Sequence, residues 1–466
     1  MNFEEAAEFA LEYALKKNVN YIDVRAEERF SEHYSINNGI LSSVVSSQES
    51  GIGVRIFKKN FAFFSTKKLE KENIKKLVDS ALKGIQKTKI KQEIKLDKYT
   101  VYKKSYQVRE SIKISNLNVD DKIKYLKDVE NNTKDVALNR FYSLSDSSVK
   151  KLFLNSEGTR IRSYIPRVSF YYIITILENN KVAQHFWQYG ASSGYEAFNK
   201  WNLKNEIRNL AIALKTNLNK GRKIKRGIMD VVVAPQVTGI IVHESCGHPY
   251  EADRILGREA AQAGESFVKK DMLGKRIGSV AVNIADDPTI KNSFGFFLYD
   301  DEGVKARKKI LMKNGLINEF LHNKESASIL NTRSNGSARS KTFEYEPIVR
   351  MSNTFMIPGD YKEEELIEGV KKGVYIKNFM EWNIDDQRLN QKYVGAEAYL
   401  IENGKITTPV INPILETTTP ELYSKVDAVA DNLEFHAGSC GKGEPMQAIP
   451  VWFGGPSFRI KSILIK

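Results

Sequence analysis

The stretch DVVVAPQVTGIIVHESCGHP, residues 230–249, predicts a strand followed at once by a helix. Residues 230–234 are mostly valine, which favours a strand. Pro235 suits the first turn of a helix, because the N–H that proline lacks is not needed there. We expect the helix to continue through His243. This junction also holds two of the six histidines and one of the two cysteines, so it is where the search for a functional site begins.

The two histidines of this stretch, His243 and His248, are five residues apart. The helical zinc-protease signature has a spacing of four. On a regular helix a spacing of four leaves the side chains roughly 40° apart, whereas five leaves them roughly 140° apart. Gly247 and Pro249 are expected to end the helix near residue 246 or 247. An irregular last turn, or a π-type widening, can then bring the His248 imidazole back toward His243.

Glu244 directly follows His243, a position from which a carboxylate can act as a general base without binding the metal. A catalytic zinc needs a third protein ligand and one open position. Cys440 is a candidate, because we expect the glycine-rich segment GSCGKG to form a loop that can approach the histidines closely. The residues alone leave three interpretations open: a catalytic metal site, core histidines with Glu244 on the surface, or a redox or nucleophilic cysteine site. Of the remaining candidates, we expect Cys246 to be a packing residue, His185 and His436 to be structural, and His33 to lie at the surface.

The first half of the chain predicts a mixed α and β domain with segregated helices and antiparallel strands. Apolar periodicity predicts four helices, over residues 3–17, 68–86, 119–138 and 196–218. Residues 51–64 predict a hairpin that turns at residues 58–60, and ENNK, residues 178–181, predicts another. Pro166 predicts a strand end or an edge. Residues 90–110 are polar and predict an extended connector, and NKGRKIKRG predicts a linker that divides the chain into domains 1–222 and 223–466.

The second half predicts a β-rich domain that carries the helix of the candidate site. Short β-runs include FGFFLYDDEG, residues 294–303, and AYLIENGKIT, residues 398–407. The tripeptides KNG and ENG predict tight hairpins. A further helix is expected at residues 361–372. The fold class predicted for the whole chain is therefore α+β.

The composition limits the classes of protein that fit. The chain has 466 residues, a net charge of +14 and only two cysteines. Two cysteines cannot build a disulfide framework, which favours a reducing compartment. The N-terminus lacks the features of a secretory signal, and the most apolar stretch, residues 231–242, is too short to span a bilayer. We therefore expect a soluble, cytoplasmic protein without a membrane partner. The basic clusters are interleaved with acidic residues and contain no groove-reading motif, so nucleic acid is not an expected partner.

The stretch IIVHESCGHPYEAD, residues 240–253, resembles the HExxxH motif of the TldD/PmbA family. Further segments resemble that family in the same order: VRMSNTFMIPGD at 349–360, KKGVYIKNF at 371–379, AEAYLIENGKITTPV at 396–410 and GSCGKG at 438–443. The resemblance is dense over the second half and loose over the first. One departure is NFMEWNIDDQRLN at 378–390, where family members carry a glycine-rich run.

The resemblance implies a zinc metallopeptidase, a hydrolase that cleaves unfolded or extended peptides. It implies that His243, His248 and Cys440 bind zinc and that Glu244 is the general base. Because all four are present, the chain resembles the TldD-type subunit, and the implied assembly is a homodimer or a heterodimer with a TldE/PmbA-type chain. Glu251 and Asp253 match acidic positions after the motif and are candidate partners of a ligand imidazole; a surface role is the alternative. The rival function is a non-catalytic binding or regulatory subunit.

Overall fold

The computed structural model has an α+β architecture, as predicted from the sequence. It describes residues 1–58, 60–88, 94–97, 100–258 and 265–466. The turn expected at 58–60 and the connector expected at 90–110 each include residues outside the described ones. Within that connector the chain forms strand β4, Lys103–Gln107, which pairs in parallel with the strand that begins at Arg160. The interpretation of the whole segment as a connector is therefore wrong at this strand.

The first half of the chain builds one seven-stranded sheet. Its order is β3-β2-β1-β5-β6-β4, and β7 also pairs with β6. Apart from β4, neighbouring strands are antiparallel. The bounds of the remaining strands are β1 (Tyr21–Asn37), β2 (Ile40–Lys58), β3 (Asn60–Thr66), β5 (Asn139–Asn155), β6 (Arg160–Glu178) and β7 (Lys181–Ala191).

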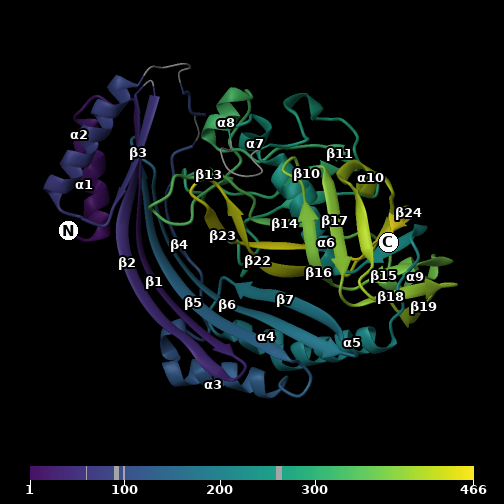
Figure 1. Cartoon of the computed structure of the whole chain (residues 1–466). Coiled ribbons are helices and arrows are strands. Elements are labelled where there is room, and N and C mark those ends of the chain that lie inside the picture. The colour runs from purple at the N-terminus through teal and green to yellow at the C-terminus, as the bar shows by residue number, and fades with distance from the viewer. Residues whose placement is uncertain (59, 89–93, 98–99, 259–264) are drawn as a thin grey trace.

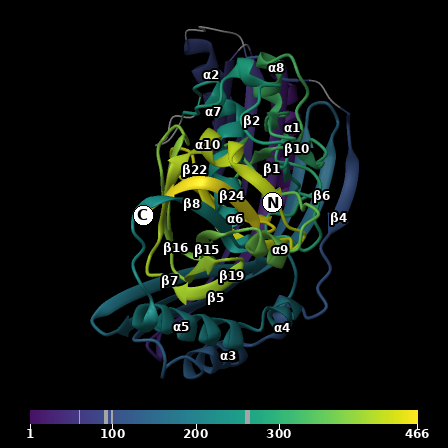
Figure 2. The same cartoon turned by 90° about the vertical axis from the view of Figure 1, so that its right-hand side faces the viewer.

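Helices cover the outer face of this long, curved sheet, and the second half of the chain lies within its curve (Figure 1). Helices α1 (Phe3–Leu15) and α2 (Lys71–Lys87) lie at one end. Helices α3 (Val119–Asn131), α4 (Glu196–Trp201) and α5 (Leu203–Lys220) lie beneath the other end, as Figure 2 shows from the side. The helix expected over 196–218 is split at Asn202, whose left-handed backbone (φ 46°) cannot continue a helix. The helix expected over 119–138 ends earlier, at Asn131.

Pro166 lies inside β6 rather than at a strand end, but on one side its neighbourhood is a local edge, so the edge alternative of the prediction is confirmed. On one side of β6 the strand β5 pairs through Pro166. On the other side β4 pairs with residues 160–164 and β7 pairs with residues 168–178, which leaves 165–167 without a partner there among the described strands. Proline has no N–H to donate to a ladder. It therefore occupies the place where β6 passes from one partner to the next.

The second half of the chain is β-rich, as predicted. A nine-stranded sheet contains β8 (Gly227–Val233), β15 (Lys372–Ile376), β16 (Phe379–Ile384), β17 (Asn390–Gly395), β18 (Ala398–Glu402), β19 (Lys405–Pro409), β20 (Ile414–Thr418), β21 (Val426–Val429) and β24 (Phe458–Ile465). A six-stranded sheet contains β9 (Ile284–Asp286), β10 (Lys309–Lys313), β11 (Leu316–Ile317), β14 (Asn353–Met356), β22 (Glu434–Lys442) and β23 (Gln447–Gly455). Strands β12 (Ala338–Arg339) and β13 (Ile348–Val349) pair with each other.

Five short α-helices accompany these sheets in the described part of the chain: α6 (Pro235–Val242), α7 (Ala252–Ile255), α8 (Lys324–Ile329), α9 (Glu363–Glu368) and α10 (Thr419–Ser424). The helix expected at 361–372 is only α9, and the β-run expected at 294–303 forms no strand. The KNG and ENG hairpins are confirmed, with Asn314 and Asn403 in the left-handed conformation that such turns need. The division of the chain between residues 222 and 223 remains a proposal.

Helix α6 connects the two larger sheets of the second half. It follows β8 of the nine-stranded sheet and packs on β14, β22 and β23 of the six-stranded sheet. Gly239 permits the close approach, since a Cβ atom there would lie 2.7 Å from a ring carbon of Phe453. The predicted strand–helix junction is therefore confirmed, and it delivers residue 243 between the sheets.

Buried ion pairs join the first sheet to the second half of the chain. Arg55 on β2 binds both carboxylate oxygens of Asp23 at 3.1 and 2.6 Å and binds Glu302 at 2.8 Å. All three side chains are almost fully buried. Burial raises the pKa of Glu346 to about 7, although the nearby charge of Arg55 acts to lower that pKa. The proton of Glu346 is thus held more tightly in the folded chain than in the unfolded chain.

Replacing Glu346 with glutamine is expected to stabilise the fold at alkaline pH. The carboxyl must ionise in a place that disfavours its charge, and glutamine does not ionise. The folded-state pKa of about 7 exceeds the usual 4.5, so the wild type loses stability as the pH rises between these values. The variant should gain about 1–3 kcal/mol above pH 7 and nothing below pH 4.5. Urea unfolding at pH 4 and pH 8 measures this; an equal effect at both values contradicts it.

Candidate metal centre

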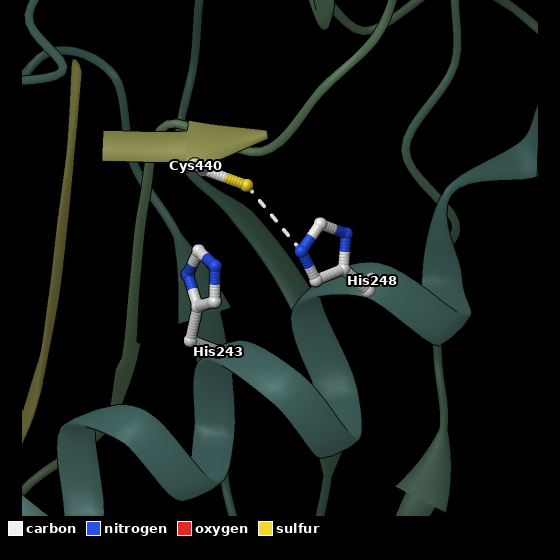
Figure 3. Close-up of side chains that lie close together, drawn as sticks. All are labelled: His243, His248 and Cys440. Atoms are coloured by element: carbon white, nitrogen blue, oxygen red, sulfur yellow. Dashed lines mark hydrogen bonds between the residues drawn. The ribbon is translucent and has the colours of Figure 1, made fainter. Parts of the chain in front are cut away.

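The two histidines of the opening stretch lie on successive turns of one continuous helix (Figure 3). After α6 the chain forms a π-helix, His243–Gly247, and then a 3₁₀ turn, His248–Tyr250. The N–H of His248 donates to the carbonyl oxygen of His243, which is the five-residue hydrogen bond of a π turn. The wider turn places residues five apart one above the other. The two imidazole rings are therefore 5.0 Å apart between centroids.

The π-type widening is the predicted alternative that the structure adopts, while the expected helix end is wrong. Gly247 and His248 both keep right-handed helical backbone angles. Gly247 is needed for space, because a Cβ atom there would lie 2.6 Å from the sulfur of Met351. Pro249 stands in the first turn of the 3₁₀ segment, where a missing N–H is tolerated.

Cys440 approaches the histidines from strand β22, with its side chain directed toward them (Figure 3). Its sulfur lies 3.3 Å from Nε2 of His248. The expectation that Cys440 lies in a glycine-rich loop is wrong: it pairs with Ile449 within the β22–β23 hairpin. Burial alone would raise the pKa of the thiol, but the neighbouring His248, Arg350 and His243 hold that pKa well below its usual value. The sulfur is therefore suited to be a thiolate ligand.

These three buried side chains fit a metal ion. One ligand atom from each of His243, His248 and Cys440 lies within 4.8 Å of the others. Tetrahedral zinc with bonds of about 2.0–2.3 Å would hold its ligand atoms roughly 3.4–3.6 Å apart. Nδ1 of His243 is buried and has no hydrogen-bond partner among the described residues. Two imidazoles and a thiolate form a donor set typical of zinc.

Glu251 holds the His248 ring from the side opposite to Cys440. Its Oε2 lies 3.0 Å from Nδ1 of His248, so an N–H at Nδ1 leaves the lone pair of Nε2 facing the sulfur. Arg254 and Lys442 also contact this carboxylate. Burial would raise the pKa of Glu251, but Lys442 and His248 keep it well below its usual value. Asp253 accepts two hydrogen bonds from the ammonium group of Lys442, at 2.7 and 2.8 Å.

Glu244 lies beside the two histidines and faces the same cavity. That cavity has a volume of about 390 Å³. The indole N–H of Trp382 donates to Oε1 of Glu244 at 3.2 Å, and Arg388 donates to Oε2 at 2.7 Å. Burial by itself raises the pKa of Glu244, but the guanidinium of Arg388 and the two neighbouring histidines lower that pKa below its usual value. Sequence reasoning missed Trp382 and Arg388 as site residues, although both lie in the segment that departs from the resembled family.

Three strand edges surround this cavity. Residues 186–188 of β7, 379 and 382 of β16 and 437–441 of β22 line it. Each of these strands is the last in its sheet among the described strands. Strands β16 and β22 both contact β7. The cavity thus lies between the first sheet and the two larger sheets of the second half.

The other histidines and the second cysteine considered in the sequence lie outside the three-residue cluster. His185 is buried and His436 is largely buried, and each packs beside an aromatic ring of the first sheet, so both occupy structural positions as expected. His33 is only partly buried, so it lies partly at the surface as expected, and its Nδ1 lies 2.8 Å from the hydroxyl of Ser145. Cys246 is fully buried, which raises its pKa well above the usual value, and it is a packing residue as expected.

Known proteins resemble this chain over nearly its whole length. Residues 226–466 match the family model described as the PmbA/TldA metallopeptidase C-terminal domain, residues 22–84 match domain 1, and residues 112–215 match the central domain. A metalloprotease of Methanocaldococcus jannaschii is 33% identical and covers 94% of this chain and 96% of its own. A zinc metalloprotease TldD homolog of Saccharolobus solfataricus is 26% identical, with 96% of each chain covered.

Solved structures share the fold. TldE from Thermococcus kodakarensis superposes with a TM-score of 0.77 at 16% identity and covers 99% of both chains. A Thermotoga maritima protein, described as a proposed modulator of a DNA gyrase, gives a TM-score of 0.81 at 19% identity and covers 100% of both chains. No helix among the described residues has the length and apolar character that a membrane span requires.

Proposed function

The chain belongs to the PmbA/TldD metallopeptidase family, and from this premise we propose that it is a zinc peptidase acting on unfolded or extended peptides. In this proposal His243, His248 and Cys440 hold the zinc, and Glu244 is the general base. The observation that carries it is the meeting of these three buried ligand side chains beside a buried glutamate, in one cavity.

Bound zinc would polarise a peptide carbonyl and lower the pKa of a water molecule. The chain's own residues prepare the remaining steps. A carboxylate oxygen of Glu244 accepts a proton from the attacking water and later donates it to the leaving amine. Trp382 and Arg388 fix the direction of that carboxylate through their hydrogen bonds. Glu251 fixes the ring of His248.

The strand edges around the cavity are a reason to propose an extended peptide as the substrate. A peptide in β conformation can pair with an exposed strand edge. Strand β22 offers such an edge and carries Cys440. A folded protein cannot supply a free strand to a cavity of about 390 Å³, so this arrangement favours unfolded chains.

Zinc content tests this proposal. The wild type is expected to bind about one zinc ion per chain after mild purification. Cys440→Ser is expected to lose this zinc, because the substitution removes the thiolate from the three proposed protein ligands. Cys246→Ala is the matched control, since this second cysteine is buried outside the cluster and should keep the metal. Elemental analysis by mass spectrometry measures the content. A wild type without metal would favour the non-catalytic binding or regulatory subunit instead.

The proposed assembly is a homodimer or a heterodimer with a TldE/PmbA-type chain. Strand β2 exposes apolar side chains at Ile40, Leu41, Val44 and Val45, which supports a protein interface there. The cytoplasmic location stays a prediction.

A further inference from the structure

A strained turn directs Arg388 into the cavity. Arg388 lies between β16 and β17 with a left-handed backbone (φ 63°), which is uncommon for a residue other than glycine. Asp385 secures the turn by accepting hydrogen bonds from the N–H groups of Leu389 and Asn390. The carbonyl oxygen of Arg388 accepts a hydrogen bond from Thr419. Backbone strain held by surrounding contacts is a feature of functional sites.

The guanidinium of Arg388 has unused hydrogen-bonding capacity. Its side chain is 13% exposed, and its hydrogen bond among the described residues goes to Glu244. Its Nε is buried without a partner among those residues. A guanidinium carries five N–H donors and binds carboxylates through two of them at once. Arg388 is also the only lysine or arginine among the described residues that line this cavity.

Arg388 lies close to the place where the leaving amine of the substrate would form. Glu244 donates its proton to the leaving amine, so that nitrogen must lie next to Glu244. In a leaving amino acid the α-carboxylate is two bonds from the amine. Arg388 lies 2.7 Å from Glu244, and it is therefore within reach of that carboxylate. In the middle of a chain a neutral peptide group would stand there, and the N–H donors of Arg388 that Glu244 does not use would face no second carboxylate.

We infer that Arg388 binds the α-carboxylate of the C-terminal residue of the substrate, so that the site removes residues from the C-terminal end of unfolded peptides. This inference rests on the proposed function. In the reaction the C–N bond breaks, the oxygen of water joins the carbonyl carbon, one proton of water passes through Glu244 to the amine, and Arg388 remains charged. The side chain of the leaving residue would meet the aromatic wall of Trp382, Phe186 and Phe379, whose rings pack together at 5.9 and 5.4 Å.

The test compares matched peptides that differ only at the C-terminus. The zinc-loaded wild type is given benzyloxycarbonyl-Gly-Phe with a free carboxylate and the same peptide as its amide. We expect kcat/KM for the free acid to exceed that for the amide by at least about 30-fold, mainly through KM. Arg388→Gln should lose most of this ratio, and Arg388→Lys should keep part of it. Lys392→Gln is the control, because Lys392 lies on the same hairpin but not in the cavity lining.

A binding measurement gives a second readout that does not need turnover. Calorimetry with N-acetyl-phenylalanine and its amide should show tighter binding of the acid to the wild type, and no difference in Arg388→Gln. Equal cleavage of acid and amide by the wild type would overturn the inference, as would a preference that survives in Arg388→Gln. If zinc-loaded wild type cleaved neither peptide, the proposed function would fail, and the binding comparison would then decide the role of Arg388 by itself.

Discussion

Replacing Glu244 with glutamine is expected to lower kcat for peptide hydrolysis by about 10²- to 10⁴-fold while the zinc content stays at the wild-type level. Glutamine has nearly the same shape and can still accept the hydrogen bond from Trp382. It cannot accept a proton from water, so the reaction loses its general base. Turnover and metal content, measured on the same preparation, separate a chemical effect from a loss of metal.

The control for this substitution is Glu381→Gln. Glu381 lies on β16, is exposed, and is outside the cavity lining, so its replacement should leave turnover unchanged. Unchanged turnover in Glu244→Gln would remove Glu244 from the mechanism. Loss of zinc in that variant would instead show that Glu244 supports the metal site.

Replacing Arg55 with leucine is expected to destabilise the fold by about 3–5 kcal/mol, because two buried carboxylates would lose their cation. Those carboxylates are Asp23 on the first sheet and Glu302 in the second half of the chain. The midpoint of urea unfolding measures the loss. Activity should fall at the same urea concentration as the fold, because β7 of the first sheet forms a wall of the cavity.

Arg208 is a matched control that separates the effect of burying an ion pair from the effect of forming one. Arg208 also binds a carboxylate through two hydrogen bonds, to Asp135, but this pair is exposed. Arg208→Leu should therefore shift the midpoint much less. Combining Arg55→Leu with Asp23→Asn and Glu302→Gln should recover part of the loss, since no buried charge is left unpaired. A midpoint for Arg55→Leu equal to that of Arg208→Leu would show that the buried pairs do not hold the two parts together.

Much of the fold could be predicted because its signals are local. Asparagine–glycine pairs mark the hairpins at 314–315 and 403–404, and the valine run before Pro235 marks β8 and α6. The predictions fail where contacts between residues far apart in the sequence determine the local structure. Asn202 splits a helix whose apolar pattern is continuous. The aromatic run at 294–303 is β-like in composition, yet it packs as a loop with buried Phe294, Phe296 and Phe297.

The candidate site was only partly accessible from sequence. His243, Glu244 and His248 lie close together on one continuous helix, so their spacing could be examined directly. Cys440 is 197 residues after His243; its glycine-rich surroundings made it a candidate, and only the family resemblance implied that it is the third ligand. Arg388 enters the cavity because of a left-handed turn, which the sequence signals only through the asparagines and aspartates around it. No pattern in a single sequence reports that such a turn faces Glu244, which lies 144 residues earlier in the chain.

The distance along the chain between the parts of the site has a consequence for protein synthesis. Ribosomes add roughly 5–20 residues per second, so the 197 residues from His243 to Cys440 take roughly 10–40 s. During that time the nascent chain holds both histidines and the glutamate but neither the thiolate nor strand β22. On the ligand set proposed above, the site cannot act on neighbouring nascent chains before β22 has been translated.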